Sequence, residues 1–136
     1  MKLANNAYDF HYKYGEIVYK NENNGIKKPV FYFVSKEDNL FILTRGSVSN
    51  EDWITDFNFT QKKVKLGNDD FYFHEGIYDA ACYIFDFILD FDISKYDSIY
   101  FVGHSYGGGI STILCVLAYY NEKFKDKKIF AFSFAG

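Results

Sequence analysis

Hydrophobic and polar residues follow two different periods along this chain, and the first of them predicts strands. Residues 16–19, 30–34 and 40–44 are short runs rich in β-branched and aromatic side chains, as is typical of strands. The polar cluster 36–39 separates the second run from the third, so these two are predicted to form a β-hairpin. Apolar and polar residues also alternate over 57–66, which predicts a further strand of the same sheet.

In the C-terminal part the period changes to that of a helix. Apolar residues recur at three- and four-residue spacing from Gly76 to Phe91, which predicts an amphipathic helix. A buried strand is expected over Ile99–Val102, a second helix after Gly107, and a last strand over 127–134. These elements predict an α/β fold in which helices flank a mixed, mostly parallel sheet.

The predicted strand and helix around residue 105 enclose a Gly-x-Ser-x-Gly motif, Gly103-His104-Ser105-Tyr106-Gly107. A strand, a tight turn flanked by glycines and a helix are the setting of a nucleophile elbow. Such a turn has no room for side chains at its flanks, so Ser105 is expected to project toward solvent or substrate. The N–H of Tyr106, at the start of the helix, is then predicted to face a developing oxyanion. A chance match is disfavoured, because both strand and helix are present.

Composition narrows the range of functions. The chain has 136 residues, of which 49% are hydrophobic and 22% aromatic, which indicates one folded domain rather than a disordered segment. The net charge of −3 gives no electrostatic footprint for nucleic acid. The glycines 107–109 follow Ser105 without a Gly-Lys-Ser/Thr or G-x-G-x-x-G pattern, which disfavours a phosphate loop. We therefore expect no cofactor, no bound metal and no nucleic-acid partner.

The cysteines and the N-terminus bear on the cellular setting. Cys82 and Cys115 fall in predicted helices among apolar neighbours, which favours two reduced core thiols. The first residues contain no apolar segment typical of a signal peptide, and no apolar run approaches membrane-spanning length. From these features we expect a cytoplasmic protein.

Three groups of residues resemble, in order and spacing, the lipase class 3 family, a branch of the α/β-hydrolase fold that acts on acylglycerols and related esters. They are Arg45-Gly46-Ser47 followed by Asp52-Trp53-Ile54-Thr55-Asp56, then His74-Glu75-Gly76, and then Gly103-His104-Ser105-Tyr106-Gly107-Gly108. The resemblance covers roughly residues 10–136. It implies that residues 1–136 form a partial lipase-like domain, a truncated α/β-hydrolase.

The resemblance also implies roles for individual residues. Ser105 is similar to the family's nucleophile. Ser47 is similar to the second oxyanion donor, through its N–H and hydroxyl, beside the Tyr106 amide; an ordinary turn serine is the alternative. His74 and His104 are expected to be structural, with His104 buried and hydrogen-bonded, and neither is expected to be the catalytic base.

Residues 48–56 match the place where fungal-type members keep a helical lid. A lid that opens at a lipid surface would expose Trp53 in a transient membrane contact. The alternative, which we favour, is that Trp53 anchors the core, because exposed apolar patches are the exception.

The chain departs from the family pattern after Ser105. The triad order is Ser, then Asp or Glu, then His, but only Glu122 and Asp126 follow as acids, and no histidine does. Without a base, a serine remains a neutral alcohol that attacks esters poorly. Residues 129–134 are also expected to form an unprotected edge strand. The chain is therefore expected to be a truncated record of a longer enzyme, a half that a second chain completes, or a decayed copy.

Two functions follow from these observations. The first is a lipase-like serine carboxylic ester hydrolase that acts on lipid or small esters through an acyl-enzyme at Ser105. The alternative is an inactive hydrolase remnant or subunit that binds a partner chain through its open sheet edge.

Overall fold

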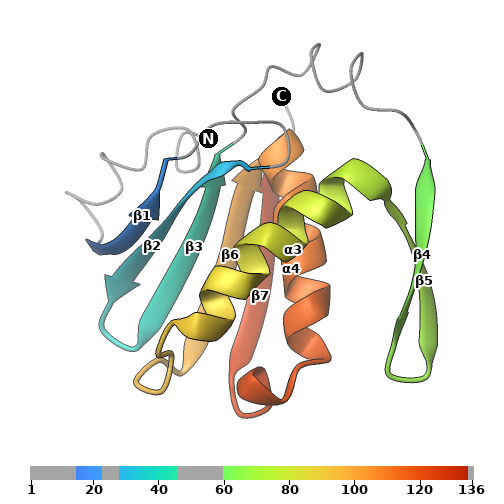
Figure 1. Cartoon of the computed structure of the whole chain (residues 1–136). Coiled ribbons are helices and arrows are strands. Elements are labelled where there is room, and N and C mark those ends of the chain that lie inside the picture. Colours follow the sequence, from blue (N-terminus) through green and yellow to red (C-terminus); the bar gives the residue numbers. More distant parts are fainter. Residues whose placement is uncertain (1–14, 23–27, 46–59, 135–136) are drawn as a thin grey trace.

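The computed structural model describes residues 15–22, 28–45 and 60–134, which build a five-stranded sheet with helices on one face (Figure 1). In spatial order the strands are β1 (Glu16–Asn21), β2 (Val30–Lys36), β3 (Asn39–Arg45), β6 (Ser98–His104) and β7 (Lys128–Phe134). Only β2 runs against the others, because β1 and β3 pair with it antiparallel while β3, β6 and β7 pair in parallel. The predicted mixed, mostly parallel sheet and the hairpin of β2 and β3 are confirmed.

Both long helices of the described chain, α3 (Glu75–Asp90) and α4 (Tyr106–Tyr119), pack on the same face of this sheet. The short 3-10 helix η1 (Glu122–Phe124) follows α4. Side chains at alternate strand positions meet the apolar stripes of the two helices and form the main core, whose fully buried members include Phe31, Phe33, Ile42, Ile84, Phe101 and Ile110. The apolar periodicity predicted a helix from Gly76 to Phe91, so each predicted end lies within one residue of the observed end of α3.

The opposite face of the sheet changes character from β2 toward β7. A small cluster of Val30, Tyr32, Val34, Leu43 and Val102 is buried there. Toward β7 the face carries an aromatic row, Phe41, Tyr100 and Phe130, whose ring centroids lie 4.7 and 4.9 Å apart in succession. Because these residues are register partners across β3, β6 and β7, the row runs straight across three strands. Phe130 and Phe132 are 40% and 46% exposed.

The strand predicted over 57–66 does not join the main sheet, so that prediction is wrong. Residues 61–66 form β4 (Gln61–Leu66), which pairs only with β5 (Asp69–His74) in a separate hairpin, and 57–59 lie outside the described residues. Gly67, with a φ of 61°, begins the turn that folds the chain back on itself. The inward side chains of the hairpin pack on the helices instead of the sheet. The ring centroids of Phe73 and Tyr78, for example, lie 5.5 Å apart.

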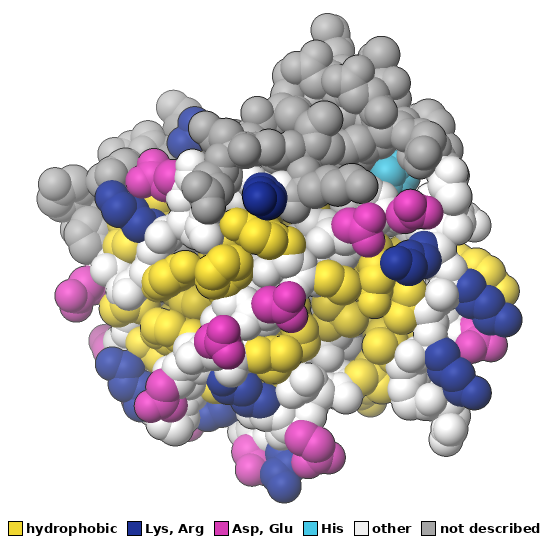
Figure 2. Space-filling view, viewed as in Figure 1, with side chains coloured by type: hydrophobic (Ala, Val, Ile, Leu, Met, Phe, Trp, Pro, Cys, Tyr) yellow, Lys and Arg dark blue, Asp and Glu magenta, His cyan; other side chains and the backbone are white. Residues whose placement is uncertain are grey.

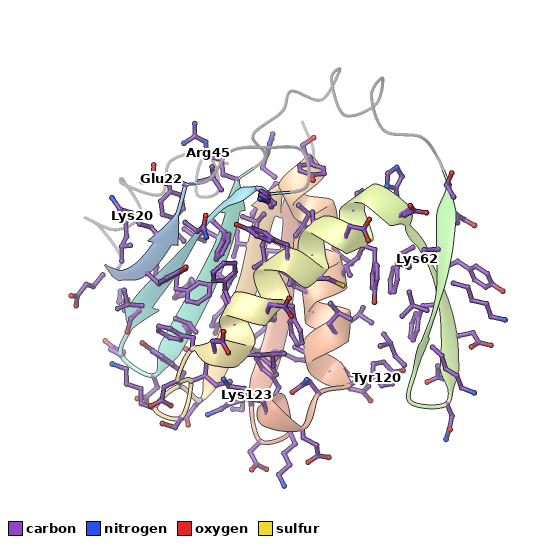
Figure 3. All side chains as sticks on the ribbon, viewed as in Figure 1. Lys20, Glu22, Arg45, Lys62, Tyr120 and Lys123 are labelled. Carbon is purple, nitrogen blue, oxygen red and sulfur yellow. The ribbon has the colours of Figure 1, made fainter. Side chains whose placement is uncertain are left out.

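At the end of the strands opposite Ser105, two lysines donate hydrogen bonds to backbone carbonyls. These carbonyls lie at the end of α3 and in the loop before β6. Lys123 Nζ donates to the carbonyls of Ile88, Leu89 and Phe91 at 3.3, 2.6 and 2.5 Å, and Figure 3 shows it below the end of α3. Lys127 Nζ donates to Tyr96 O at 2.6 Å. The last turn of α3 contains no basic residue, so Lys123 supplies from η1 the positive charge that suits a helix C-terminus.

The surface over the helices mixes all kinds of side chain. Figure 2 shows acidic and basic side chains interspersed around apolar patches on this face. On α3, the Asp79 carboxylate lies 3.8 Å from Lys62 Nζ of β4. Within the described ranges, no helix has both the length and the apolar character needed to cross a membrane.

Candidate active site

Ser105 occupies a sharp bend between β6 and α4. It is the N-cap residue of α4, with φ 56° and ψ −115°. Glu37, in the turn between β2 and β3, is the only other non-glycine residue of the described chain with a positive φ. Such a backbone costs about 1–3 kcal/mol and persists only where the surroundings enforce it, often at functional sites. The predicted elbow geometry is therefore present.

Glycines enforce the bend by removing side chains where backbones meet. A Cβ on Gly103 would lie 2.0 Å from the oxygen and 2.2 Å from the carbonyl carbon of Gly107. Real Cβ atoms do not approach backbone so closely. Strand and helix therefore pass at close range at Gly103, as predicted, while the same role for Gly107 remains a prediction.

Strand β7 also contacts the elbow, which the sequence pattern did not predict. The N–H of Ser105 donates to the Phe134 carbonyl at 2.6 Å. One residue earlier, Ser133 lies against Gly108, where an added Cβ would meet the Ser133 hydroxyl oxygen at 2.3 Å. The signal that could have pointed to this contact is Gly108 itself, a second helix-disfavouring glycine directly after the motif.

The hydroxyl of Ser105 remains available for chemistry. Serine at an N-cap usually accepts a hydrogen bond from the helix backbone, but among the described residues Ser105 makes no such capping bond through its side chain. Its carbonyl instead accepts from Gly109 N–H at 3.1 Å. Ser105 is half-buried, so its side chain is neither sealed in the core nor fully in solvent.

The start of α4 is suited to a negative charge. The first amides of a helix point out of its N-terminus, and the helix dipole places a partial positive charge there. The first turn of α4 contains no acidic residue to neutralise it. The bend therefore lies beside a group of donors that favours an oxyanion.

The Tyr106 side chain belongs to the core. It is 1% exposed, and burial raises the pKa of its phenol well above the ordinary value of 10.0. The hydroxyl therefore remains protonated at neutral pH. Only the backbone N–H of Tyr106 is left for the role assigned to this residue, which remains a prediction.

The described histidines are placed as supports. His74 is the N-cap of α3, and its Nδ1 accepts from the N–H of Ile77 at 3.2 Å, which confirms a structural position. His104 is half-buried and pairs in register with Phe134. The expectation that His104 is fully buried is therefore wrong, because it lies at the exposed end of β6, and its expected hydrogen bond remains a prediction.

Several predicted residues lie outside the described chain: Ser47, Trp53 and the segment 48–56. The last described residue before them is Arg45, which is exposed at the end of β3 (Figure 3). Its neighbour Thr44 pairs with Gly103, so β3 ends beside the elbow.

Features unrelated to the elbow give no second catalytic centre. Cys82 and Cys115 are free and half-buried at the edge of the core, and burial raises the pKa of both thiols. Among residues 15–22, 28–45 and 60–134, no group of three His, Cys, Asp or Glu side chains is placed to hold a metal ion. A groove of about 360 Å³ lies between β5, α4 and β7, and its lining includes Phe71, Tyr119 and Ile129 but not Ser105.

Comparison with known families agrees with this geometry. The family described as lipase (class 3) matches residues 41–136, which include most of β3, the elbow and β7. The chain belongs to the lipase (class 3) family. A comparison with curated proteins finds no match.

Solved lipase structures share the fold of this family member. The triacylglyceride lipase of Rhizomucor miehei is 21% identical, with a TM-score of 0.68 over 86% of this chain and 46% of its own. The mono- and diacylglycerol lipase of Aspergillus oryzae is 22% identical, with a TM-score of 0.63 over 81% and 43%. A triacylglycerol lipase whose catalytic centre is a serine protease triad is 22% identical, with a TM-score of 0.62 over 76% and 41%. The chain thus spans less than half the length of these relatives.

Proposed function

We propose that this lipase (class 3) family member is a serine carboxylic ester hydrolase with Ser105 as its nucleophile. The observation that carries the proposal is the backbone of Ser105, a positive-φ bend that holds an uncapped hydroxyl at the N-terminus of α4. A structural N-cap serine needs neither a strained backbone nor a free hydroxyl. A nucleophile needs both exposure and nearby amides.

The proposed reaction passes through an acyl-enzyme. Ser105 Oγ forms a bond to the ester carbonyl carbon, and the carbonyl oxygen becomes an oxyanion. When the oxyanion collapses, the ester C–O bond breaks and the alcohol leaves with a proton. Water then hydrolyses the acyl-enzyme and releases the carboxylic acid. The Tyr106 amide and Ser47 are proposed as the oxyanion donors, each of which lowers the barrier by about 3 kcal/mol.

This chemistry also requires a group that accepts the Ser105 proton. We do not assign that role to a described histidine. His74 Nδ1 is engaged by the N–H of Ile77, and His104 lies at the end of β6 on the face opposite the helices. By analogy with the relative that uses a serine protease triad, we propose a histidine supported by an acidic residue.

The substrate class follows from the relatives. Two of them are described as lipases of tri- or of mono- and diacylglycerols, so we propose acylglycerols or related lipid esters as substrates. Hydrolysis of p-nitrophenyl esters with short and long acyl chains will measure the preferred length.

A fluorophosphonate probe followed by peptide mapping tests the proposal on the protein as its source cells produce it. We expect one labelled peptide, carrying Ser105, and loss of both label and ester hydrolysis in Ser105→Ala. Ser94→Ala, in the exposed loop after α3, is the matched control and should label like the wild type. Absence of label on Ser105 in a folded wild-type protein would refute the nucleophile.

The second candidate is a non-catalytic subunit that binds a partner chain along β7. It is favoured by the position of β7 as an edge strand of the described sheet and by the exposure of Phe130 and Phe132. Sedimentation analysis distinguishes the two candidates: a monomer that labels at Ser105 supports the hydrolase, whereas an unlabelled stable complex supports the subunit.

A further inference from the structure

Strand β7 contacts the elbow through two consecutive residues, and we infer that Ser133 is a positioning residue for Ser105. The inference rests on the proposed function, since it concerns the placement of the proposed nucleophile. Ser133 itself does not touch the reacting atoms; it acts through the first turn of α4.

The first contact is steric. An added Cβ on Gly108 would lie 2.3 Å from Ser133 Oγ, and 3.2 Å from both Ser133 Cβ and the Gly103 carbonyl oxygen. The Ser133 side chain therefore occupies the space into which any side chain at position 108 would project. The contact fixes how closely β7 and the first turn of α4 approach each other.

The second contact transmits this spacing to the nucleophile. Phe134, the next residue of β7, accepts the N–H of Ser105 at 2.6 Å. A shift of β7 relative to α4 must therefore stretch this bond or move Ser105. Displacement of a reacting group by about 1 Å costs on the order of 100-fold in rate. A small change at Ser133 should therefore change the reaction rate of Ser105 strongly.

The neighbouring glycine provides a matched control. Gly109 is the next residue of the same helical turn, but a Cβ there would meet only the side chain of Ile77, at 3.2 Å from its Cδ1. At 3.2 Å the Ile77 methyl needs to give by only a few tenths of an ångström, whereas the 2.3 Å approach to Ser133 Oγ forces a larger shift. The same added methyl group at 108 and at 109 should therefore have different consequences for Ser105.

The test is a rescue series on the whole protein, read as the maximal rate of fluorophosphonate labelling and the probe concentration at half-maximal rate. Gly108→Ala is expected to lower the maximal rate about 30-fold, in line with a sub-ångström displacement of the nucleophile. The half-maximal concentration should change little. Adding Ser133→Gly, which removes the atom at 2.3 Å and leaves only the Gly103 carbonyl oxygen at 3.2 Å, should bring the rate within about threefold of wild type.

Two further variants sharpen the series. Ser133→Ala should rescue Gly108→Ala less completely than Ser133→Gly does, because the Ser133 Cβ at 3.2 Å remains. Gly109→Ala should label at the wild-type rate. Glycine in the middle of a strand costs about 0.5–1 kcal/mol, so a purely structural role of Ser133 predicts that the double variant is worse than Gly108→Ala, the opposite of rescue.

A second readout keeps the inference independent of the proposed function. The amide proton resonance of Ser105 reports its bond to Phe134; we expect Gly108→Ala to shift it and Ser133→Gly to return it. If wild type does not label but these shifts occur, the hydrolase proposal fails and the positioning role stands. If Gly108→Ala leaves both resonance and labelling unchanged, or if Ser133→Gly restores neither, the positioning role is refuted.

Discussion

The two ends of α4 are held in place by opposite means. Before its start, Gly103 lies against the backbone of Gly107, so the elbow depends on the absence of a side chain at Gly103. Beyond its end, Lys123 reaches across to three carbonyls at the C-terminus of α3. The first arrangement tolerates no added atom, and the second depends on one charge. The elbow should therefore be disrupted by substitutions that add a side chain, and the contact between η1 and α3 by substitutions that remove a charge.

The largest effect is expected for Gly103→Ala. The new Cβ would lie 2.0 Å from a carbonyl oxygen that belongs to the backbone of α4, so strand and helix must separate. We expect a loss of about 4 kcal/mol or more in the free energy of unfolding, the range of severe core disruption, measured by urea denaturation. Gly109→Ala is the control and should cost little. A Gly103→Ala protein of wild-type stability would contradict the close approach.

Lys123→Met should have the next largest effect, by removing charge rather than by adding bulk. Hydrogen bonds to charged groups contribute about 1.5–3 kcal/mol each, and a lost donor leaves its acceptors unpaired, so a loss of about 2 kcal/mol is expected in urea denaturation. The rate of Ser105 labelling in the folded fraction should not change.

Lys125→Met is the matched control for this charge. Lys125 is a solvent-exposed partner of Glu122 at 3.8 Å, and such exposed pairs contribute at most about 1 kcal/mol. Equal losses for the two lysine variants would show that the carbonyl contacts of Lys123 contribute nothing specific.

Ser111→Ala is expected to stabilise the protein. Ser111 is fully buried in α4, and in the described part of the chain its hydroxyl has no hydrogen-bond partner. Removing an unsatisfied buried polar group, together with the better helix propensity of alanine, should raise the free energy of unfolding by about 1 kcal/mol. Thermal and urea unfolding both measure this. A destabilised variant would indicate a partner for the hydroxyl.

The smallest effect concerns the tip of the hairpin. Tyr120 OH donates to Asp69 Oδ2 at 2.7 Å, and this bond raises the pKa of Tyr120 above its ordinary value. Because the folded state then holds the proton longer than the unfolded state, the stability from this bond is present below the ordinary tyrosine pKa and is lost as pH rises through the folded pKa. Asp69→Asn should lower the Tyr120 pKa, measured by tyrosine absorbance during titration.

The local patterns of the sequence predicted much of this fold, and their limits have a physical cause. The periodicity of α3, the apolar run of β6 and the glycines of the elbow are local signals, and each was located correctly. The hairpin of β4 and β5 was missed, because the pairing of alternating strands depends on which surface is available to cover them. The half-exposure of His104 likewise depends on neighbours remote in sequence.

The same limit applies to the candidate site. Ser105 and Gly103 are recognised from a motif of five residues, since strand, turn and helix adjoin in the chain. Ser133 and the Phe134 carbonyl reach the elbow only through the parallel pairing of β6 with β7. No spacing within the sequence specifies which strand will lie there, so this part of the site needed three-dimensional information.

The bond from Ser105 to Phe134 has a consequence for the order of events during protein synthesis. The serine leaves the ribosome many residues before its acceptor, and α4 must be made in between. Until β7 emerges and pairs with β6, the bend lacks the hydrogen bond from the Ser105 N–H to the Phe134 carbonyl. A nascent chain arrested before Phe134 should therefore contain the motif without the shaped nucleophile, and reactivity should arise only late in translation.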